Sequence, residues 1–122
     1  MPKKIVLILA IGYTIVLAIV SLMAITSPLN IGTNYDDKIF HIFAYGILFI
    51  LWYFALLRLK TIKPIFKAVL FSVFYGIIIE VLQGQFTIVR KLDILDVLAN
   101  CIGVMIASFF IIIRNRTIVK KL

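Results

Sequence analysis

Four long apolar stretches run through this chain, separated by short segments of polar and turn-forming residues. The stretches cover about residues 5–25, 39–57, 65–83 and 92–113. A helix rises about 1.5 Å per residue, so about 20 residues cross a hydrocarbon core of roughly 30 Å. The pattern therefore predicts an all-α, polytopic membrane protein built as a four-transmembrane-helix bundle.

The composition agrees with one small membrane domain covering residues 1–122. Of these 122 residues, 64% are hydrophobic, and the mean hydropathy is +1.19. A soluble domain of this size would have too little polar surface to cover its core. The first apolar run follows a short basic start, as in a signal peptide, but it is longer than a typical signal h-region. We therefore expect it to remain as the first transmembrane helix.

The basic residues predict the orientation of the bundle. Ten of the 13 Lys and Arg residues lie before the first span, in residues 58–67 around the start of the third span, or after the fourth span. Short basic loops stay in the cytoplasm, so both termini of this multi-pass protein are expected there. The net charge of +8 is then a topology signal, and we expect the lipid bilayer and no nucleic acid as a partner.

Polar residues within the spans recur at helical spacing near one end of three of them. Separations of three and four residues place such groups on one helix face. In hydrocarbon they are costly unless they meet one another or line a wet cavity. We therefore expect an inward-facing polar pocket open to the outer side, with the first span as a scaffold. The polar groups are Asp37, His41 and Tyr45, then Glu80 and Gln83, then Asp93, Asp96 and Asn100.

Counting residues from the basic end of each span places the deeper polar groups in two layers, with a charged rim above them. The lower layer lies roughly 20 Å above the cytoplasmic boundary and the upper one roughly 24–27 Å above it. The lower layer is expected to hold Tyr45, Glu80 and Asn100, and the upper layer His41, Gln83 and Asp96. The rim is expected to hold Asp36, Asp37, Lys38, Arg90, Lys91 and Asp93.

Three residues are candidates for acid–base catalysis: His41, Glu80 and Asp96. Carboxyl and imidazole groups can transfer protons to or from a bound headgroup, and an arginine can clamp phosphate or carboxylate. The substrate-binding candidates are Asp37, Lys38, Tyr45, Gln83, Arg90, Asp93 and Asn100.

Two other interpretations of these residues stay open. His41 with Glu80, Asp93 and Asp96 could bind zinc or manganese. Because no two of them have a diagnostic zinc spacing, we assign no metal ligand and leave the cofactor unknown. Alternatively, the polar groups only cross-link the helices through hydrogen bonds.

The order and spacing of the polar residues resemble the VanZ-like family, small bacterial membrane proteins named after a teicoplanin-resistance accessory protein. The resemblance covers about residues 37–107. The matching residues are Asp37-Lys38-x-x-His41-x-x-x-Tyr45, Glu80-x-x-Gln83, and Arg90-x-x-Asp93-x-x-Asp96-x-x-x-Asn100-x-x-Gly103. A glycine common in the family is Ala107 here, which still permits close helix packing.

The resemblance implies a plasma-membrane protein that alters the cell surface or its susceptibility to glycopeptides. It supplies no reaction, so whether the chain is an enzyme stays open. The expected function is that the pocket engages or modifies a lipid-linked cell-surface component, such as a cell-wall precursor or another amphipathic ligand. The alternative is a structural or regulatory membrane subunit without catalytic activity.

Overall fold

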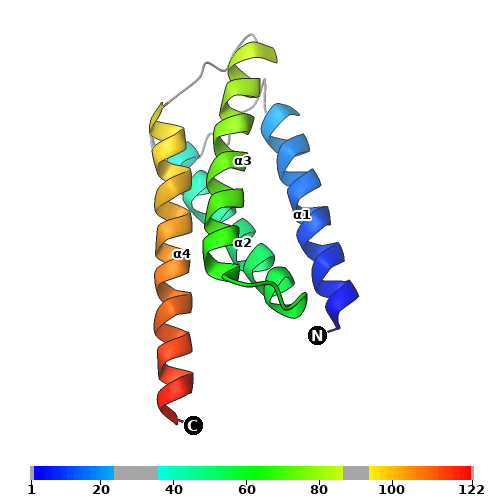
Figure 1. Cartoon of the computed structure of the whole chain (residues 1–122). Coiled ribbons are helices and arrows are strands. Elements are labelled where there is room, and N and C mark those ends of the chain that lie inside the picture. Colours follow the sequence, from blue (N-terminus) through cyan, green and yellow to red (C-terminus); the bar gives the residue numbers. More distant parts are fainter. Residues whose placement is uncertain (1, 24–35, 87–93, 122) are drawn as a thin grey trace.

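The computed structural model describes residues 2–23, 36–86 and 94–121, which form four α-helices and no strand (Figure 1). Each helix contains a stretch that is long and apolar enough to span a membrane. The expected all-α bundle is thus confirmed. The helices are α1 (Lys3–Met23), α2 (Asp36–Arg58), α3 (Pro64–Phe86) and α4 (Ile94–Lys121).

Each helix extends beyond the apolar stretch that predicted it at one end at least, and α2 and α4 do so through charged residues. α2 begins at Asp36 rather than near residue 39, and α4 continues to Lys121 rather than ending near residue 113. Acidic residues suit the first turn of a helix and basic residues its last turn, because they complement the helix dipole. The hydrocarbon therefore sets where the apolar run ends, while these charged residues let the helix continue.

The outer surface of the bundle is apolar on all four helices. Ile8 of α1 is 67% exposed and Met105 of α4 is 68% exposed, and Phe43 and Phe74 are exposed on α2 and α3. A water-soluble monomer rarely exposes so much apolar surface, whereas lipid chains cover it favourably. The helices therefore indicate a membrane protein.

The two ends of the bundle differ in chemistry. α1 begins and α4 ends at the same end of the bundle, where the connection between α2 and α3 also lies (Figure 1). We call this the basic end, because Lys3 begins α1, Arg58 ends α2, Lys63 directly precedes α3 and Arg116 lies near the end of α4. The opposite end, where α1 and α3 end and α2 and α4 begin, is called the polar end. The start of α1 and the end of α4 therefore lie on the same side of the bundle, as expected.

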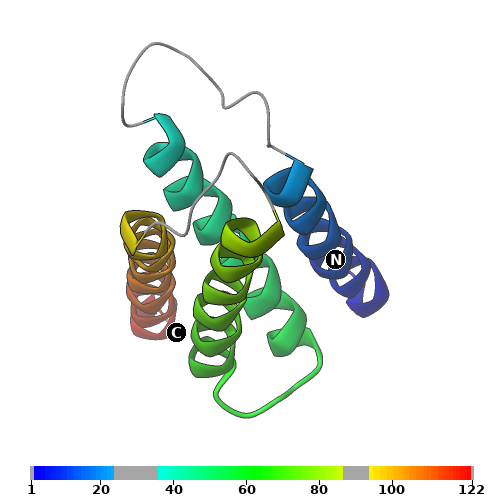
Figure 2. The same cartoon turned by 90° about the horizontal axis from the view of Figure 1, so that it is seen from above.

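α2 is the central helix, and its closest neighbour is α4. α2 packs against the other three helices, and Figure 2 shows it crossing between them. A Cβ atom added to Gly103 would lie 2.1 Å from the carbonyl oxygen of Ile42, and one added to Gly46 would lie 3.3 Å from the Gly103 oxygen. At Gly103 only glycine permits this approach of the two backbones, whereas the contact at Gly46 is tight. The crossing brings the polar face of α4 beside that of α2.

Hydrogen bonds centred on Thr14 hold α1 against α2 and α3. The indole nitrogen of Trp52 donates to the Thr14 hydroxyl at 2.8 Å, and the Tyr75 hydroxyl donates to the Thr14 carbonyl. The Tyr13 hydroxyl donates to the Ala44 carbonyl at 2.6 Å. α1 thus packs as the expected scaffold, but through polar contacts that the sequence pattern did not predict.

Candidate functional site

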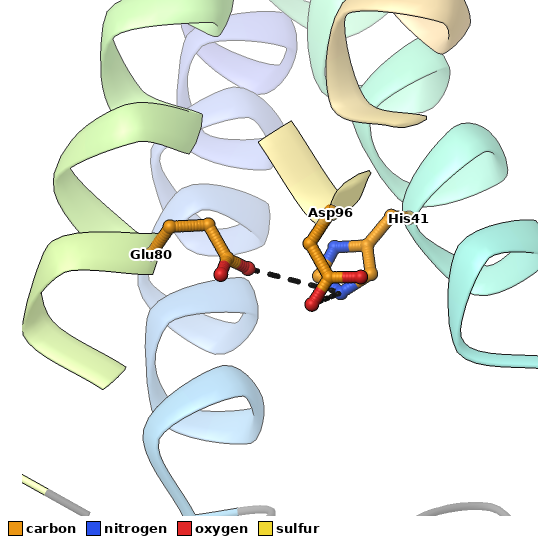
Figure 3. Close-up of side chains that lie close together, drawn as sticks. All are labelled: His41, Glu80 and Asp96. Atoms are coloured by element: carbon orange, nitrogen blue, oxygen red, sulfur yellow. Dashed lines mark ion pairs between the residues drawn. The ribbon is translucent and has the colours of Figure 1, made fainter. Parts of the chain in front are cut away.

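The polar end of the bundle holds a cluster of three buried ionisable side chains from three helices. His41 lies near the start of α2, Glu80 in the last third of α3, and Asp96 in the first turn of α4. They are 4%, 1% and 3% exposed, respectively. His41 Nε2 lies 4.0 Å from Glu80 Oε1 and 3.8 Å from Asp96 Oδ2. Figure 3 shows the two carboxylates converging on the imidazole.

Lys38 lies over this cluster and pairs with one of its carboxylates. Its Nζ donates to Asp96 Oδ1 at 2.6 Å, and its side chain is 22% exposed. Because Lys38 is three residues before His41 on α2, both lie on the same helix face. Asp96 thus offers one oxygen to the ammonium group and turns the other toward the imidazole.

The ends of the helices also favour negative charge in this region. α2 and α4 both begin at the polar end, and the N-terminus of a helix carries a partial positive charge. Asp96 lies in the first turn of α4, where this partial charge acts most strongly on a carboxylate. Lys38 and the N-terminus of α4 therefore stabilise a carboxylate that would be costly to bury alone.

A second polar group lies one helical turn below the cluster. Tyr45 follows His41 by four residues and Asn100 follows Asp96 by four, and both are buried. A Cβ added to Gly76 would lie 2.9 Å from Asn100 Nδ2 and 3.1 Å from Tyr45 Cε2. Within the described parts of the chain, the Tyr45 hydroxyl and both polar atoms of the Asn100 amide have no hydrogen-bond partner. Buried polar atoms are usually satisfied, so these mark where a ligand or water can bind.

The expected two layers are confirmed in part and wrong for Glu80. The carboxylate of Glu80 belongs to the upper group with His41 and Asp96, whereas Gly76 faces Tyr45 in the lower group. Counting from basic residues assumed that every helix meets the membrane boundary at the same height. Glu80 of α3 lies farther from the basic end than the count from Lys67 predicted.

Several predicted site residues fall outside what the structure describes. Arg90 and Asp93 lie in the segment 87–93, and the side chains of Asp37 and Gln83 are likewise outside the described set. Their roles stay predictions. The expected opening of the pocket also stays a prediction, because residues 24–35 and 87–93 connect the helices at that end.

Ser21 is a buried polar residue at this end that the sequence did not single out. It lies near the end of α1, in a span treated as a scaffold. A lone serine in an apolar helix gives little signal, since serine can bond to its own helix backbone. Its position is known from the structure, because α1 ends at Met23, two residues after Ser21, and this end of α1 lies at the polar end.

The described cluster combines groups that suit three kinds of chemistry. An imidazole beside carboxylates can transfer a proton, two carboxylates with an imidazole can hold a metal ion, and the Lys38 ammonium can bind an anion. No protein-family model, curated protein or solved structure matches this chain.

Proposed function

We propose that this chain is a VanZ-like protein of the bacterial plasma membrane whose polar site engages or modifies the headgroup of a lipid-linked cell-surface component. The observation that carries the proposal is the buried cluster of His41, Glu80 and Asp96 with Lys38 at one end of an otherwise apolar bundle. Ionisable groups at membrane depth are rare and usually serve a substrate, an ion or a proton.

The orientation belongs to the same proposal. The basic end carries most of the Lys and Arg residues and is placed in the cytoplasm, with both termini. The polar end then faces the cell exterior, where lipid-linked wall precursors are used. The Lys38 ammonium provides a cation there for a phosphate or carboxylate group.

An apolar groove beside the site supports an amphipathic ligand. The groove lies between α1 and α2 and has a volume of about 290 Å³. Phe40, which lines it, directly precedes His41, so the groove reaches the depth of the cluster. A hydrocarbon chain can lie in this groove while its polar end reaches the charged residues. The groove is lined by Tyr13, Val16, Leu17, Val20, Phe40, Phe43, Ala44 and Ile47.

A structural or regulatory subunit is the second candidate function, and one observation favours it. The contacts of Asp96 with Lys38 and His41, and of His41 with Glu80, join α2, α3 and α4 at the polar end. Such contacts could serve only to fix the helices. Interhelical polar contacts in membrane proteins average about 0.6 kcal/mol, which is a weak reason to bury this many ionisable groups.

Substitutions at the cluster distinguish the two functions. Glu80→Gln and Asp96→Asn keep the side-chain shape and remove the charge, and Ser72→Ala is the matched control, since Ser72 is buried on α3 two turns below Glu80. We expect cells producing the wild type or Ser72→Ala to tolerate more teicoplanin than cells producing Glu80→Gln or Asp96→Asn, at equal membrane levels. Equal tolerance for all four proteins, or loss of tolerance only together with loss of protein, would favour the structural role.

A further inference from the structure

We infer that His41, Glu80 and Asp96 form a binding site for one divalent transition-metal ion, of the class of Zn²⁺ or Mn²⁺. The inference rests on the proposed function in one respect, since the ion would lie in the same site and meet the same ligand. It names a cofactor that the order of residues alone did not assign. It also has a readout that does not depend on any cellular activity.

The distances between the three side chains are close to those that a metal ion requires. One ligand atom from each residue lies within 4.8 Å of the other two, and the His41 Nε2 separations are 3.8 and 4.0 Å. Ligand atoms at about 2.0–2.2 Å from a tetrahedral ion stand about 3.3–3.6 Å apart. The distances between the ligand atoms therefore need to shorten by only a few tenths of an ångström to roughly 1 Å to bind such an ion.

The type of ligand also suits these metals. Imidazole nitrogen and carboxylate oxygen together bind zinc and manganese, and a site with three protein ligands keeps a coordination position open for water or substrate. The hydrogen bond to the second oxygen of Asp96 matters as well, because hydrogen bonds to a ligating carboxylate orient it. Lys38 holds Asp96 Oδ1 in this way and leaves Oδ2 on the side of His41.

Charge explains what the loaded site would attract. With a neutral imidazole, the two carboxylates and the Lys38 ammonium leave one negative charge, and a divalent ion turns this into one positive charge. An uncompensated charge is costly in a buried, low-dielectric site. An anionic group would complete both the charge and the coordination. The ligand class is therefore a phosphate ester or carboxylate.

The rival explanation is a proton in place of the metal. A protonated His41 between Glu80 and Asp96 would also reduce the charge of the cluster. The two explanations differ in what binds the purified protein. A proton-only site has no reason to retain a transition metal against a chelator, whereas a three-ligand site does.

A direct test uses the full chain, purified in detergent with a tag free of histidine and stripped with a chelator. Zn²⁺ or Mn²⁺ is added back, and bound metal is measured after gel filtration. We expect about one ion per chain, with affinity lowered about tenfold or more in His41→Ala and Glu80→Gln. Ser72→Ala should bind as the wild type does. No retained metal, or equal retention by all four proteins, would overturn the inference.

A spectroscopic measurement on the unmodified chain covers the case in which a variant fails to fold. The chain contains a single histidine. Pulsed electron paramagnetic resonance of bound Mn²⁺ should therefore show coupling to one imidazole nitrogen, which only His41 can supply. Bound Mn²⁺ without nitrogen coupling would mean binding elsewhere and would contradict the site.

The same preparation tests the anion and separates the two proposals. If any phosphate suffices, we expect inorganic phosphate to change the Mn²⁺ spectrum. If the lipid is required, we expect the spectrum to change only with vesicles containing a polyprenyl phosphate. No change with either would contradict the anionic ligand. Metal binding without any effect on teicoplanin tolerance would reject the proposed function alone. If Glu80→Gln abolishes teicoplanin tolerance while the wild-type protein retains no metal, the metal site alone would be rejected.

Discussion

At the scale of single residues, burial differs sharply between the two partners of the pair at the polar end. The Asp96 side chain is nearly completely buried, whereas Lys38 retains access to solvent. A buried charge that loses its partner keeps its desolvation penalty, but a partly exposed ammonium can turn toward water. Asp96 therefore depends strongly on Lys38, whereas Lys38 depends less on Asp96.

This asymmetry predicts the order of two substitutions. We expect Lys38→Met to lower the free energy of unfolding by about 1–3 kcal/mol, because it leaves the Asp96 carboxylate buried beside Glu80. Asp96→Asn should lower it by less. Thermal unfolding of the detergent-solubilised proteins measures both. The double variant should lose less than the two single losses combined, and full additivity would show that the pair is not coupled.

At the scale of helices, the site depends on how closely α2 and α4 approach. His41 and Asp96 lie on different helices, and the crossing at Gly103 and Gly46 holds these helices together below the cluster. The backbone oxygen of Ile42 occupies the space that a Cβ at Gly103 would need. Small residues at such crossings let helix backbones touch, which drives packing in membranes.

Gly103→Ala tests this crossing. The added Cβ would lie 2.1 Å from the Ile42 oxygen and 2.9 Å from its carbon, so the two helices must move apart. We expect a loss of about 1–3 kcal/mol in the free energy of unfolding, as for other overpacked contacts. Metal retention should weaken as well, since His41 and Asp96 would separate.

Gly12→Ala is the matched control for that substitution. Gly12 lies in the interior of α1, and a Cβ there would meet nothing within 4 Å. Alanine favours the helix over glycine by roughly 0.5–1 kcal/mol, so stability should be equal or higher. A similar loss in both variants would show that the loss at Gly103 comes from the helix itself and not from its contact with α2.

At the scale of the whole molecule, charge separates the two ends of the bundle. Both termini of the described helices and the connection between α2 and α3 lie at the basic end, opposite the buried cluster (Figure 1). In short loops of a membrane protein, Lys and Arg remain in the cytoplasm. The structure shows that these segments share a side, and the charge rule proposes which side it is.

Cysteine labelling in a Cys101→Ser background tests this arrangement. We expect Lys60→Cys and Arg116→Cys to react with an impermeant thiol reagent only after the cells are opened. Both residues are exposed, one in the connection between α2 and α3 and the other near the end of α4. Arg90→Cys, in the connection outside the described residues, should react in intact cells. The reverse pattern would invert the orientation, and different sides for positions 60 and 116 would contradict the fold.

The sequence predicted the elements because hydrophobic length is a local property. Four apolar runs of membrane-spanning length specify four helices whatever their arrangement, and the spacing from His41 to Tyr45 specifies one polar face. The same reasoning predicted that polar faces from three spans would meet, since lipid cannot satisfy them. The described structure confirms this for His41, Asp96 and their neighbours on α2 and α4.

The tertiary structure decided which groups touch, because contact depends on helix tilt, rotation and crossing distance rather than on spacing along one chain. It placed the Glu80 carboxylate 4.0 Å from the His41 imidazole, and it brought Lys38 to Asp96 across 58 positions of sequence. It also showed that Thr14 receives the Trp52 indole, which no periodicity predicts. By itself, the sequence determined that polar groups must gather at one end of the bundle. Only the packing of α2, α3 and α4 against one another determined that an imidazole and two carboxylates lie within 4.8 Å of one another.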